Sequence, residues 1–283
     1  MGVKLIADSG ATKAEWCVVS KGKVKTVFTQ GISPYFLNKE QIRSLLEKEL
    51  LPKIKKYTIS EVYYYGTGLG NPANARMMKL LLKQVFSRAK KIEAEHDLTA
   101  AARALCGNKK GIACILGTGS NSCFYNGKKI VKNSPGLGFI LGDEGSGAYL
   151  GKKVVQYYLY NTFDEDLKAR FDAKYNVTQN EILEAVYKKP MPNRYLAGYS
   201  LFLAENRGHY MIENIIEDGL NEFFFNHLYK YSESWTNPIN FAGGVAWGFR
   251  DVLKELCSTY QLEIGTILKN PMEGLIKYHS LKN

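Results

Sequence analysis

Apolar residues recur along the first part of the chain in a pattern that predicts strands first and helices afterwards. Apolar stretches joined by short turns predict three successive strands, at residues 3–7, 17–20 and 24–30. Residues 38–56 carry apolar side chains at helical spacing with charges between them. The segments that follow predict, in order, a strand at 61–65, a helix at 73–90, a strand at 91–95 and a helix at 98–105.

The same plan restarts at Gly111. Apolar runs predict strands at 112–116, 121–125 and 129–131, followed by helices at 145–161, 165–172, 178–187, 193–206 and 210–231. The chain finishes with a strand at 239–242, a helix at 247–260, a strand at 262–267 and a short helix from Pro271.

A polar G-N-K-K-G run at residues 107–111 separates the two halves, so we place a domain boundary near Asn108. The pattern predicts an α/β protein with one domain at 1–107 and a second at 108–283. The second domain contains a helical insertion, and the last helix is able to return to the first domain.

Length and charge restrict the classes of partner. The 283 residues, 45% of them apolar, are enough for two domains with full cores. The formal net charge of +11 makes an anionic partner worth considering. The lysines, however, form runs at 21–25, 53–56 and 128–132 and no single arginine and aromatic stripe. This pattern favours solvated surface charge, and we expect no nucleic acid partner.

The five cysteines favour free buried thiols. Their number is odd, no C-x-x-C occurs, and four lie in or beside apolar runs, which is typical of a reducing compartment and not of disulfides or zinc. The four histidines show no metal-ligand spacing. No apolar stretch is long enough to span a bilayer and no signal peptide precedes the first strand. We therefore expect a cytoplasmic protein without membrane association.

Two turns of similar composition carry the candidate chemistry. Residues 8–16 read D-S-G-A-T-K-A-E-W between two apolar runs, and residues 111–124 read G-I-A-C-I-L-G-T-G-S-N-S-C-F. A strand–turn–strand with Gly, Ser and Thr at its tip presents backbone N–H groups and hydroxyls to an anion. Two phosphate-sized turns in the two halves of one chain suggest a duplicated fold that binds a nucleotide.

The commoner nucleotide motifs are absent. Asn71, Ser122 and Leu141 stand where a G-x-G-x-x-G motif requires its third glycine. The Gly151-Lys152-Lys153 segment lacks both the earlier glycine and the following Ser or Thr of a Walker A loop. A nucleotide would have to be bound by another arrangement.

Four motifs in a fixed order point to a family. D-S-G-A-T-K, I-L-G-T-G-S-N, G-L-G-F-I-L-G-D-E-G-S and F-A-G-G-V-A follow one another along nearly the whole chain. Together they resemble the N-acetylglucosamine kinases, of the BadF/BadG/BcrA/BcrD-type ATPase family within the sugar kinase, actin and heat-shock chaperone superfamily. The resemblance implies two ribonuclease H-like (actin-like ATPase) domains with a cleft between them. It also implies ATP-dependent phosphorylation of an amino sugar, most simply N-acetylglucosamine to its 6-phosphate, with Mg²⁺.

The resemblance assigns roles to residues of this sequence. Asp97 looks like the general base that accepts the proton of the sugar hydroxyl, and Asp8 like the aspartate that holds Mg²⁺ through water. The implied ATP contacts are Gly10, Thr12, Lys13, Gly117, Thr118, Gly119, Gly243 and Gly244. The implied sugar contacts are Ser120, Asn121, Gly136, Leu137, Gly138 and Asp143.

Each assignment has a plainer alternative. Asp8 is able to accept backbone N–H groups in an ordinary hairpin turn. Asp97 and Asp143 each precede a predicted helix, where Asp is a preferred N-cap, and Glu144 reads more readily as a cap partner than as a ligand. The 241–248 segment is compatible with an ordinary strand–helix turn.

Two positions depart from the family's pattern, and other functions share the fold. The loop at 33–35 lacks the expected Asn, and Leu137 replaces the Trp of a Gly-Trp-Gly segment. Muramic acid or glucosamine derivatives are therefore alternative substrates. Alternative functions are the ATPase activator of a 2-hydroxyacyl-CoA dehydratase and a non-catalytic sugar or nucleotide sensor. Family members are often dimers, which makes a homodimer one expectation.

Overall fold

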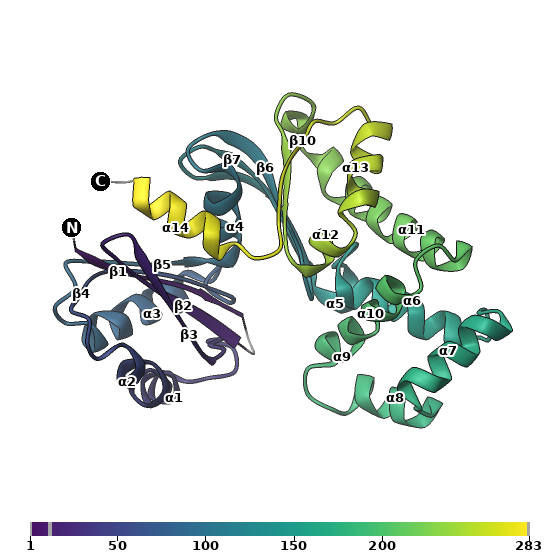
Figure 1. Ribbon diagram of the computed structural model, residues 1–283, viewed down its shortest axis with the longest axis horizontal. Helices are drawn as coiled ribbons and strands as arrows, with labels where there is room; N and C mark the ends of the chain where they lie inside the picture. The colour runs from purple at the N-terminus through teal and green to yellow at the C-terminus, as the bar shows by residue number, and fades with distance from the viewer. Residues whose placement is uncertain (1, 11–12, 282–283) are drawn as a thin grey trace. The chain divides into compact units, whose positions relative to one another are not determined.

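The structure, a computed structural model, describes residues 2–10 and 13–281 (Figure 1). The chain divides into two compact units. Unit 1 comprises Met1–Gly107 together with Pro271–Asn283, and unit 2 comprises Asn108–Asn270. Each unit is built around one five-stranded sheet.

The sheet of unit 1 has the strand order β3-β2-β1-β4-β5. Its strands are β1 (Val3–Ser9), β2 (Lys13–Ser20), β3 (Lys23–Gln30), β4 (Ile59–Gly66) and β5 (Lys91–His96). β2 is antiparallel to both β1 and β3, whereas β4 and β5 run parallel to β1. The parallel strands are possible because helical crossovers separate them in the chain.

Helices cover both faces of this sheet. Side chains alternate along a strand, so Leu5 and Ala7 of β1 pack in one cluster while Ile6 packs in another. The first cluster is completed by α1 (Lys39–Leu45), η1 (Leu46–Leu50), α2 (Leu51–Ile54) and α3 (Pro72–Val85). The second is completed by α4 (Asp97–Cys106) and α14 (Met272–Leu281).

The sheet of unit 2 repeats this topology. Its strands are β6 (Lys110–Leu116), β7 (Ser120–Asn126), β8 (Ile130–Ser134), β9 (Ile239–Ala242) and β10 (Ile264–Leu268). The order β8-β7-β6-β9-β10 matches β3-β2-β1-β4-β5 strand for strand, with three antiparallel strands followed by two parallel ones. The α/β class and the duplicated ribonuclease H-like architecture are therefore confirmed.

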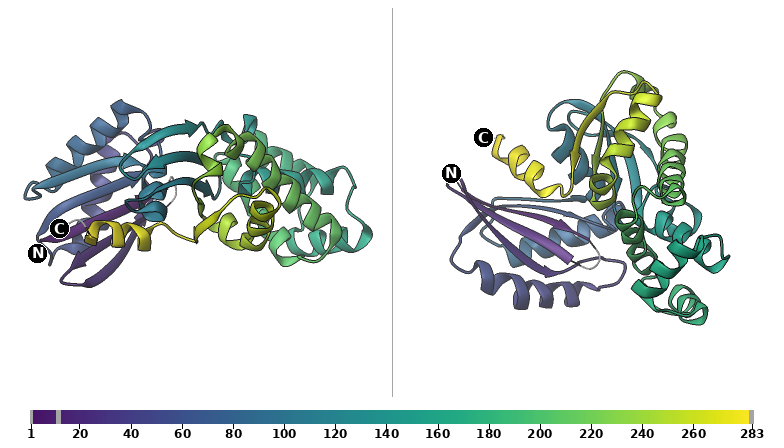
Figure 2. Two further views of the ribbon diagram at one scale, coloured as in Figure 1. Left: turned by 90° about the horizontal axis from the view of Figure 1, so that it is seen from above. Right: turned by 45° about the vertical axis from the view of Figure 1, so that its right-hand side comes forward.

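Most helices of unit 2 lie between β8 and β9. They are α5 (Gly138–Leu141), α6 (Gly147–Leu159), α7 (Glu165–Tyr175), α8 (Gln179–Tyr187), α9 (Pro192–Gly198), α10 (Ser200–Glu205) and α11 (Tyr210–Asn226), followed by the short turns η2 (Leu228–Lys230) and η3 (Ser232–Trp235). They gather into one bundle in the views of Figure 2. After β9 come α12 (Gly244–Gly248) and α13 (Arg250–Thr259).

Several helix ends differ from the sequence prediction. The helix expected at 73–90 ends at Val85, because Phe86 turns into the core and the Lys90 N–H bonds to Ser60 in the sheet. The helix expected at 193–206 is two helices, divided at the buried Tyr199. The helix expected at 210–231 ends at Asn226. The helix expected at 247–260 is two helices, which divide at Phe249. Within residues 2–10 and 13–281, no helix is both long and apolar enough to cross a bilayer.

Candidate functional site

The carboxyl ends of three parallel strands meet at one edge of the unit 1 sheet. The register pairs Ser9 of β1 with Gly66 of β4, and Gly66 with His96 of β5. Asp8, the 67–70 loop and Asp97 therefore share this edge. Binding groups commonly gather at such an edge because the loops that leave parallel strands lie side by side there.

Asp8 lies in an acidic, partly desolvated position. Burial raises the pKa of its carboxyl to about 7, and the nearby charges of Asp97 and Glu15 add to the shift. An ionised Asp8 is thus destabilised unless a cation compensates the three carboxylates. The carboxylate of Asp8 fits a Mg²⁺ ion, because Mg²⁺ is usually bound by only one or two carboxylates. Water and phosphate oxygens supply its other ligands. In the described part of the chain, no group of three or more His, Cys, Asp or Glu side chains forms a metal cage.

His96, and not Asp97, caps helix α4. The Nδ1 atom of His96 accepts the backbone N–H of Leu98 at 3.2 Å. Asp97 is the first residue of the helix, its Oδ1 lies 3.1 Å from His96 Nδ1, and its side chain is 35% exposed. The N-cap alternative for Asp97 is therefore wrong, and its carboxylate remains open to solvent at the favourable end of the helix dipole.

Two loops approach this edge closely. A Cβ on Gly70 would lie 3.2 Å from the His96 ring. Gly68 has a φ of +80°, and a Cβ there would lie 3.1 Å from the ring of Tyr35. Glycine is needed at position 68 because the chain turns left-handed against an aromatic ring. The contact brings the exposed rings of Tyr35 and Phe36 to the same edge.

The first turn lies at the end of β1. The Gly10 N–H donates to the Lys13 carbonyl at 3.0 Å, which closes the turn. The Lys13 ammonium lies 3.7 Å from the centre of the Phe28 ring, so its charge faces β3 in this structure. Thr12, the remaining residue assigned to this turn, lies outside the described residues.

The second turn, at the start of unit 2, is tied to helix α6. The Gly117 N–H donates to Gly119 at 3.0 Å and closes the turn between β6 and β7. The N–H groups of Gly147 and Ala148, at the start of α6, donate to the carbonyls of Gly117 and Thr118 at 2.8 and 3.0 Å. The turn's carbonyls are thus satisfied by a helix end that would otherwise have free donors.

Gly243 packs its backbone against this turn. Its φ is +126°, and a Cβ would lie only 2.2 Å from the Leu116 carbonyl oxygen. Its N–H donates to Leu268 at 2.9 Å, and Gly244 starts α12 directly afterwards. The two glycines therefore place bare backbone next to the residues that precede the second turn.

Asp143 brings together three of the predicted sugar contacts, namely itself, Ser120 and Gly138. It is 8% exposed, and its carboxylate accepts the backbone N–H groups of Ser120 and Gly138. A Cβ on Gly119 would lie 2.8 Å from Asp143 Oδ2. Burial, the largest influence, raises the pKa of Asp143 above its ordinary value. The N-cap of α6 is Ser146, which accepts the Tyr149 N–H, so the N-cap alternative for Asp143 is wrong.

The remaining predicted sugar contacts border this cluster. A Cβ on Gly136 would lie 2.8 Å from the Ser120 carbonyl oxygen and 3.7 Å from Asn121. The Ser120 hydroxyl is buried and, within the described residues, has no hydrogen-bond partner. Leu137 is exposed, as are Ile140 and Leu141 on the short helix α5. Residues 120–143 of unit 2 thus combine the unsatisfied hydroxyl of Ser120, the buried carboxylate of Asp143 and the exposed apolar side chains of α5.

Two histidines near these segments were missed by the sequence analysis. His96 precedes Asp97, and His227 contacts Glu144 with its Nε2 atom 3.4 Å from the carboxylate. Glu144 is therefore paired with a histidine and is not a cap partner. The only sequence signal for His96 was its position between a strand and a helix. Nothing local connects His227 to residue 144.

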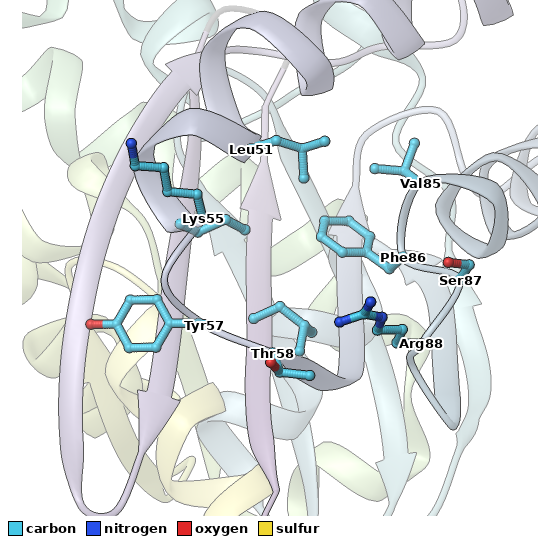
Figure 3. A pocket seen from close by; sticks show the side chains of 10 residues that line it. Leu51, Lys55, Tyr57, Thr58, Val85, Phe86, Ser87 and Arg88 are labelled. Atoms are coloured by element: carbon cyan, nitrogen blue, oxygen red, sulfur yellow. The ribbon is translucent and has the colours of Figure 1, made fainter.

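A hollow of about 380 Å³ lies at the opposite edge of unit 1 (Figure 3). Its walls are both apolar and polar: Leu51 and Phe86 line it, and so do Lys55 and Arg88. These two cations follow the carboxyl ends of α2 and α3, where helix dipoles favour positive charge. The hollow contains none of the residues assigned to sugar or nucleotide.

Comparison with solved structures places this architecture among kinases, whereas no protein-family model and no curated protein matches the sequence. The chain is 40% identical to a protein of Porphyromonas gingivalis provisionally named as an N-acetylglucosamine kinase, over 98% of this chain and 99% of that one, with a TM-score of 0.94. A Chromobacterium violaceum protein with the same provisional name has 16% identity, coverage of 98% and 99%, and a TM-score of 0.73. A ROK family glucokinase of Streptomyces griseus, solved with glucose and AMPPNP, has 16% identity, coverage of 99% of both chains and a TM-score of 0.55. The last two similarities concern the fold.

Proposed function

The chain belongs to the N-acetylglucosamine kinase family, and from this premise we propose that it transfers the γ-phosphoryl group of ATP to a hydroxyl of N-acetylglucosamine. It is an ATP-dependent sugar kinase. The identity of the sugar, the position phosphorylated and the roles of individual residues are proposals. Their support comes from the geometry within each unit.

The observation that carries the sugar assignment is the cluster around Asp143. The buried carboxylate of Asp143 accepts the Ser120 backbone N–H, and the buried Ser120 hydroxyl has no hydrogen-bond partner among the described residues. Carboxylates and hydroxyls of this kind bind sugar hydroxyls, and a substrate that lacked those hydroxyls would leave buried polar groups unpaired. The exposed side chains of Leu137 and Ile140 offer an apolar surface for the methyl group of an N-acetyl substituent.

The two turns support the ATP assignment. Each unit has a short turn between its first two strands, and we propose that the backbone near Gly10 and the backbone at 117–119 bind phosphate oxygens. Gly243 and Gly244 would lie against the nucleoside, since neither has a side chain to keep a ligand away from the backbone. Asp8 would hold Mg²⁺ through water, and the bound ion would neutralise charge on the transferring phosphoryl group.

Asp97 is the proposed general base. Because His96 caps α4, the carboxylate of Asp97 is not committed to the helix end. The sugar hydroxyl would give its proton to Asp97 as its oxygen bonds to the γ-phosphorus and the bond to the bridging oxygen breaks, which leaves ADP. Asp8, with its raised pKa, is less suited to stay ionised without a cation.

The cysteines do not favour the dehydratase-activator alternative. Cys114, Cys123 and Cys257 are buried in the core of unit 2, and burial raises the pKa of Cys257 to about 12. A cluster bridged between subunits requires accessible thiolates. The homodimer, the cytoplasmic location and the absence of nucleic acid and membrane partners stay predictions of the sequence.

The test is a coupled ADP-release assay with Mg·ATP and a panel of N-acetylglucosamine, N-acetylmannosamine, N-acetylmuramic acid, glucosamine and glucose. Asp97→Asn is expected to lower kcat by about 10²-fold or more, since general base catalysis typically contributes that much. Asp166→Asn is the matched control, because Asp166 also lies in the first turn of a helix but pairs with Arg170 on an exposed surface. ATP hydrolysis that is independent of sugar and unchanged by Asp97→Asn would contradict the proposal.

A further inference from the structure

A buried row of polar side chains joins the end of α11 to strand β7 and to the loop before α6. His227 follows α11, is 2% exposed and stacks on Phe223 with ring centroids 4.6 Å apart. Its Nδ1 lies 3.2 Å from Ser122 Oγ, and its Nε2 lies 3.4 Å from Glu144 Oε2. Ser122 Oγ is in turn 2.9 Å from the Tyr231 hydroxyl.

The direction of these hydrogen bonds follows from the available donors. The Ser134 backbone N–H donates to the Tyr231 oxygen at 2.5 Å, and the Tyr231 hydroxyl donates to the Ser122 carbonyl oxygen at 3.0 Å. The Ser122 hydroxyl then donates to His227 Nδ1, and a neutral imidazole donates its Nε2–H to Glu144. Burial lowers the pKa of His227, which favours this neutral form. Every proton in the row has an acceptor, which a buried polar network requires.

Two members of this row, Glu144 and Ser122, lie beside proposed sugar contacts. Glu144 directly follows Asp143, and Ser122 directly follows Asn121, whose side-chain oxygen accepts the Ser122 N–H at 2.9 Å. Asp143 has a φ of +58°, a left-handed conformation that costs free energy in a residue other than glycine. Such a conformation persists only where its surroundings fix it.

The same helix fixes the loop at a second point. A Cβ on Gly145 would lie 2.9 Å from the Cβ of Phe223, so the loop backbone rests against α11 one turn before His227. Glu144 and Gly145 together attach the loop to the end of this helix. Removing the imidazole would leave only the backbone contact.

We propose that His227 is a positioning residue for sugar binding, which holds the Asp143 loop and the Asn121 strand at a fixed separation through Glu144 and Ser122. The inference rests on the proposed function, because it takes Asp143 and Asn121 as sugar contacts. His227 acts through these neighbours, since its own ring is buried. Its loss therefore weakens sugar binding, while ATP binding is retained.

The experiment compares wild type, His227→Phe and Glu144→Gln in steady-state kinetics. Phenylalanine keeps a ring against Phe223 and removes both nitrogens, so we expect the KM for N-acetylglucosamine to rise about tenfold or more, as for loss of a buried hydrogen bond. The KM for ATP is expected to stay within about twofold. Glu144→Gln keeps an oxygen that accepts the His227 Nε2–H, and it should remain closer to wild type than His227→Phe does.

His279→Phe is the matched control. His279 is also 2% exposed and also stacks on an aromatic ring, Tyr63, at 3.7 Å, and it lies in α14 of unit 1. Its substitution is expected to lower the melting temperature without changing the KM for sugar. Equal sugar KM values in the folded His227→Phe and His279→Phe proteins would overturn the proposal. If His227→Phe does not fold, Glu144→Ala replaces it.

A second readout separates the positioning role from the proposed function. Hydrogen exchange measured by mass spectrometry reports on residues 142–146 whether or not the protein has turnover. We expect exchange there to be about tenfold faster in His227→Phe than in wild type and unchanged in His279→Phe. Absence of sugar phosphorylation by wild type would defeat the proposed function alone. Unchanged exchange at 142–146 in His227→Phe would defeat the positioning role.

Discussion

Gly243 occupies a position where a side chain would collide with the backbone just before the turn at 117–119. Its φ of +126° and the 2.2 Å separation between a Cβ and the Leu116 carbonyl oxygen both require glycine. We predict that Gly243→Ala lowers the free energy of unfolding by about 3 kcal/mol or more, because strain and overpacking add. It should also raise the KM for ATP. Urea unfolding and steady-state kinetics measure the two effects.

Gly248→Ala provides the comparison for that substitution. Gly248 ends the same short helix, and a Cβ there meets nothing within 4 Å. Alanine at this site should change the free energy of unfolding by less than about 0.5 kcal/mol. Similar losses in the two variants would show that the contact with Leu116 is unimportant.

The buried imidazole of His227 gives a pH dependence with a defined sign. Burial lowers its pKa below the ordinary value of 6.5, while the charge of Glu144, the carboxylate that it faces, opposes the shift. The unfolded chain therefore takes up a proton at this residue at higher pH than the folded chain does. The contribution of His227 to the free energy of unfolding therefore falls as pH decreases below this ordinary value.

His227→Gln removes this contribution. Between about pH 7.5 and pH 5.5, wild type should lose more stability than the variant does, as measured by urea unfolding. Parallel losses in the two proteins would show that His227 titrates alike in the folded and unfolded states.

At the level of single residues, sequence reasoning located the candidate carboxylates better than their surroundings. Asp8, Asp97 and Asp143 stand at strand or helix junctions that the apolar pattern defines. Which residue caps each helix could not be predicted, because His96 and Ser146 compete with neighbouring acids for the same N–H groups. That competition is decided by backbone angles, which the sequence alone does not specify.

At the level of elements, helix α14 packs against α4 at a contact that only glycine permits. A Cβ on Gly274 would lie 2.4 Å from the Ala104 carbonyl oxygen, which belongs to rigid helix backbone. Alanine normally stabilises a helix interior by about 1 kcal/mol relative to glycine. We predict that the clash outweighs this gain, so that Gly274→Ala lowers the melting temperature.

Gly198→Ala tests the propensity effect without the clash. Gly198 ends α9, and a Cβ there meets nothing within 4 Å. This variant should be as stable as wild type or slightly more so in the same thermal scan. A Gly274→Ala protein that is also more stable than wild type would mean that α14 shifts freely on α4.

Strands were predicted more accurately than helix ends, for a physical reason. A strand such as β1 is marked by apolar side chains that serve both faces of a sheet. The end of α3 has no glycine or proline to mark it, and the helix stops where Phe86 enters the core. Tertiary packing, which depends on distant residues, decided that boundary.

At the level of the whole molecule, duplication is the organising feature. The strand order of unit 1 recurs in unit 2, and the first turn of each sheet carries small polar residues. This repetition was readable from the sequence because the pattern of strands restarts at Gly111. The row from Glu144 to Tyr231 was not, because its members are far apart in the chain and only the fold brings them together.

The central claim is that this chain couples ATP cleavage to phosphorylation of an amino sugar. Purified protein with Mg·ATP and N-acetylglucosamine would be analysed by mass spectrometry for the sugar phosphate and, in parallel, for ADP. We expect both products in equal amounts, formed about 10²-fold or more slowly by Asp97→Asn. ADP without sugar phosphate, or no product from any acetylated amino sugar, would contradict it.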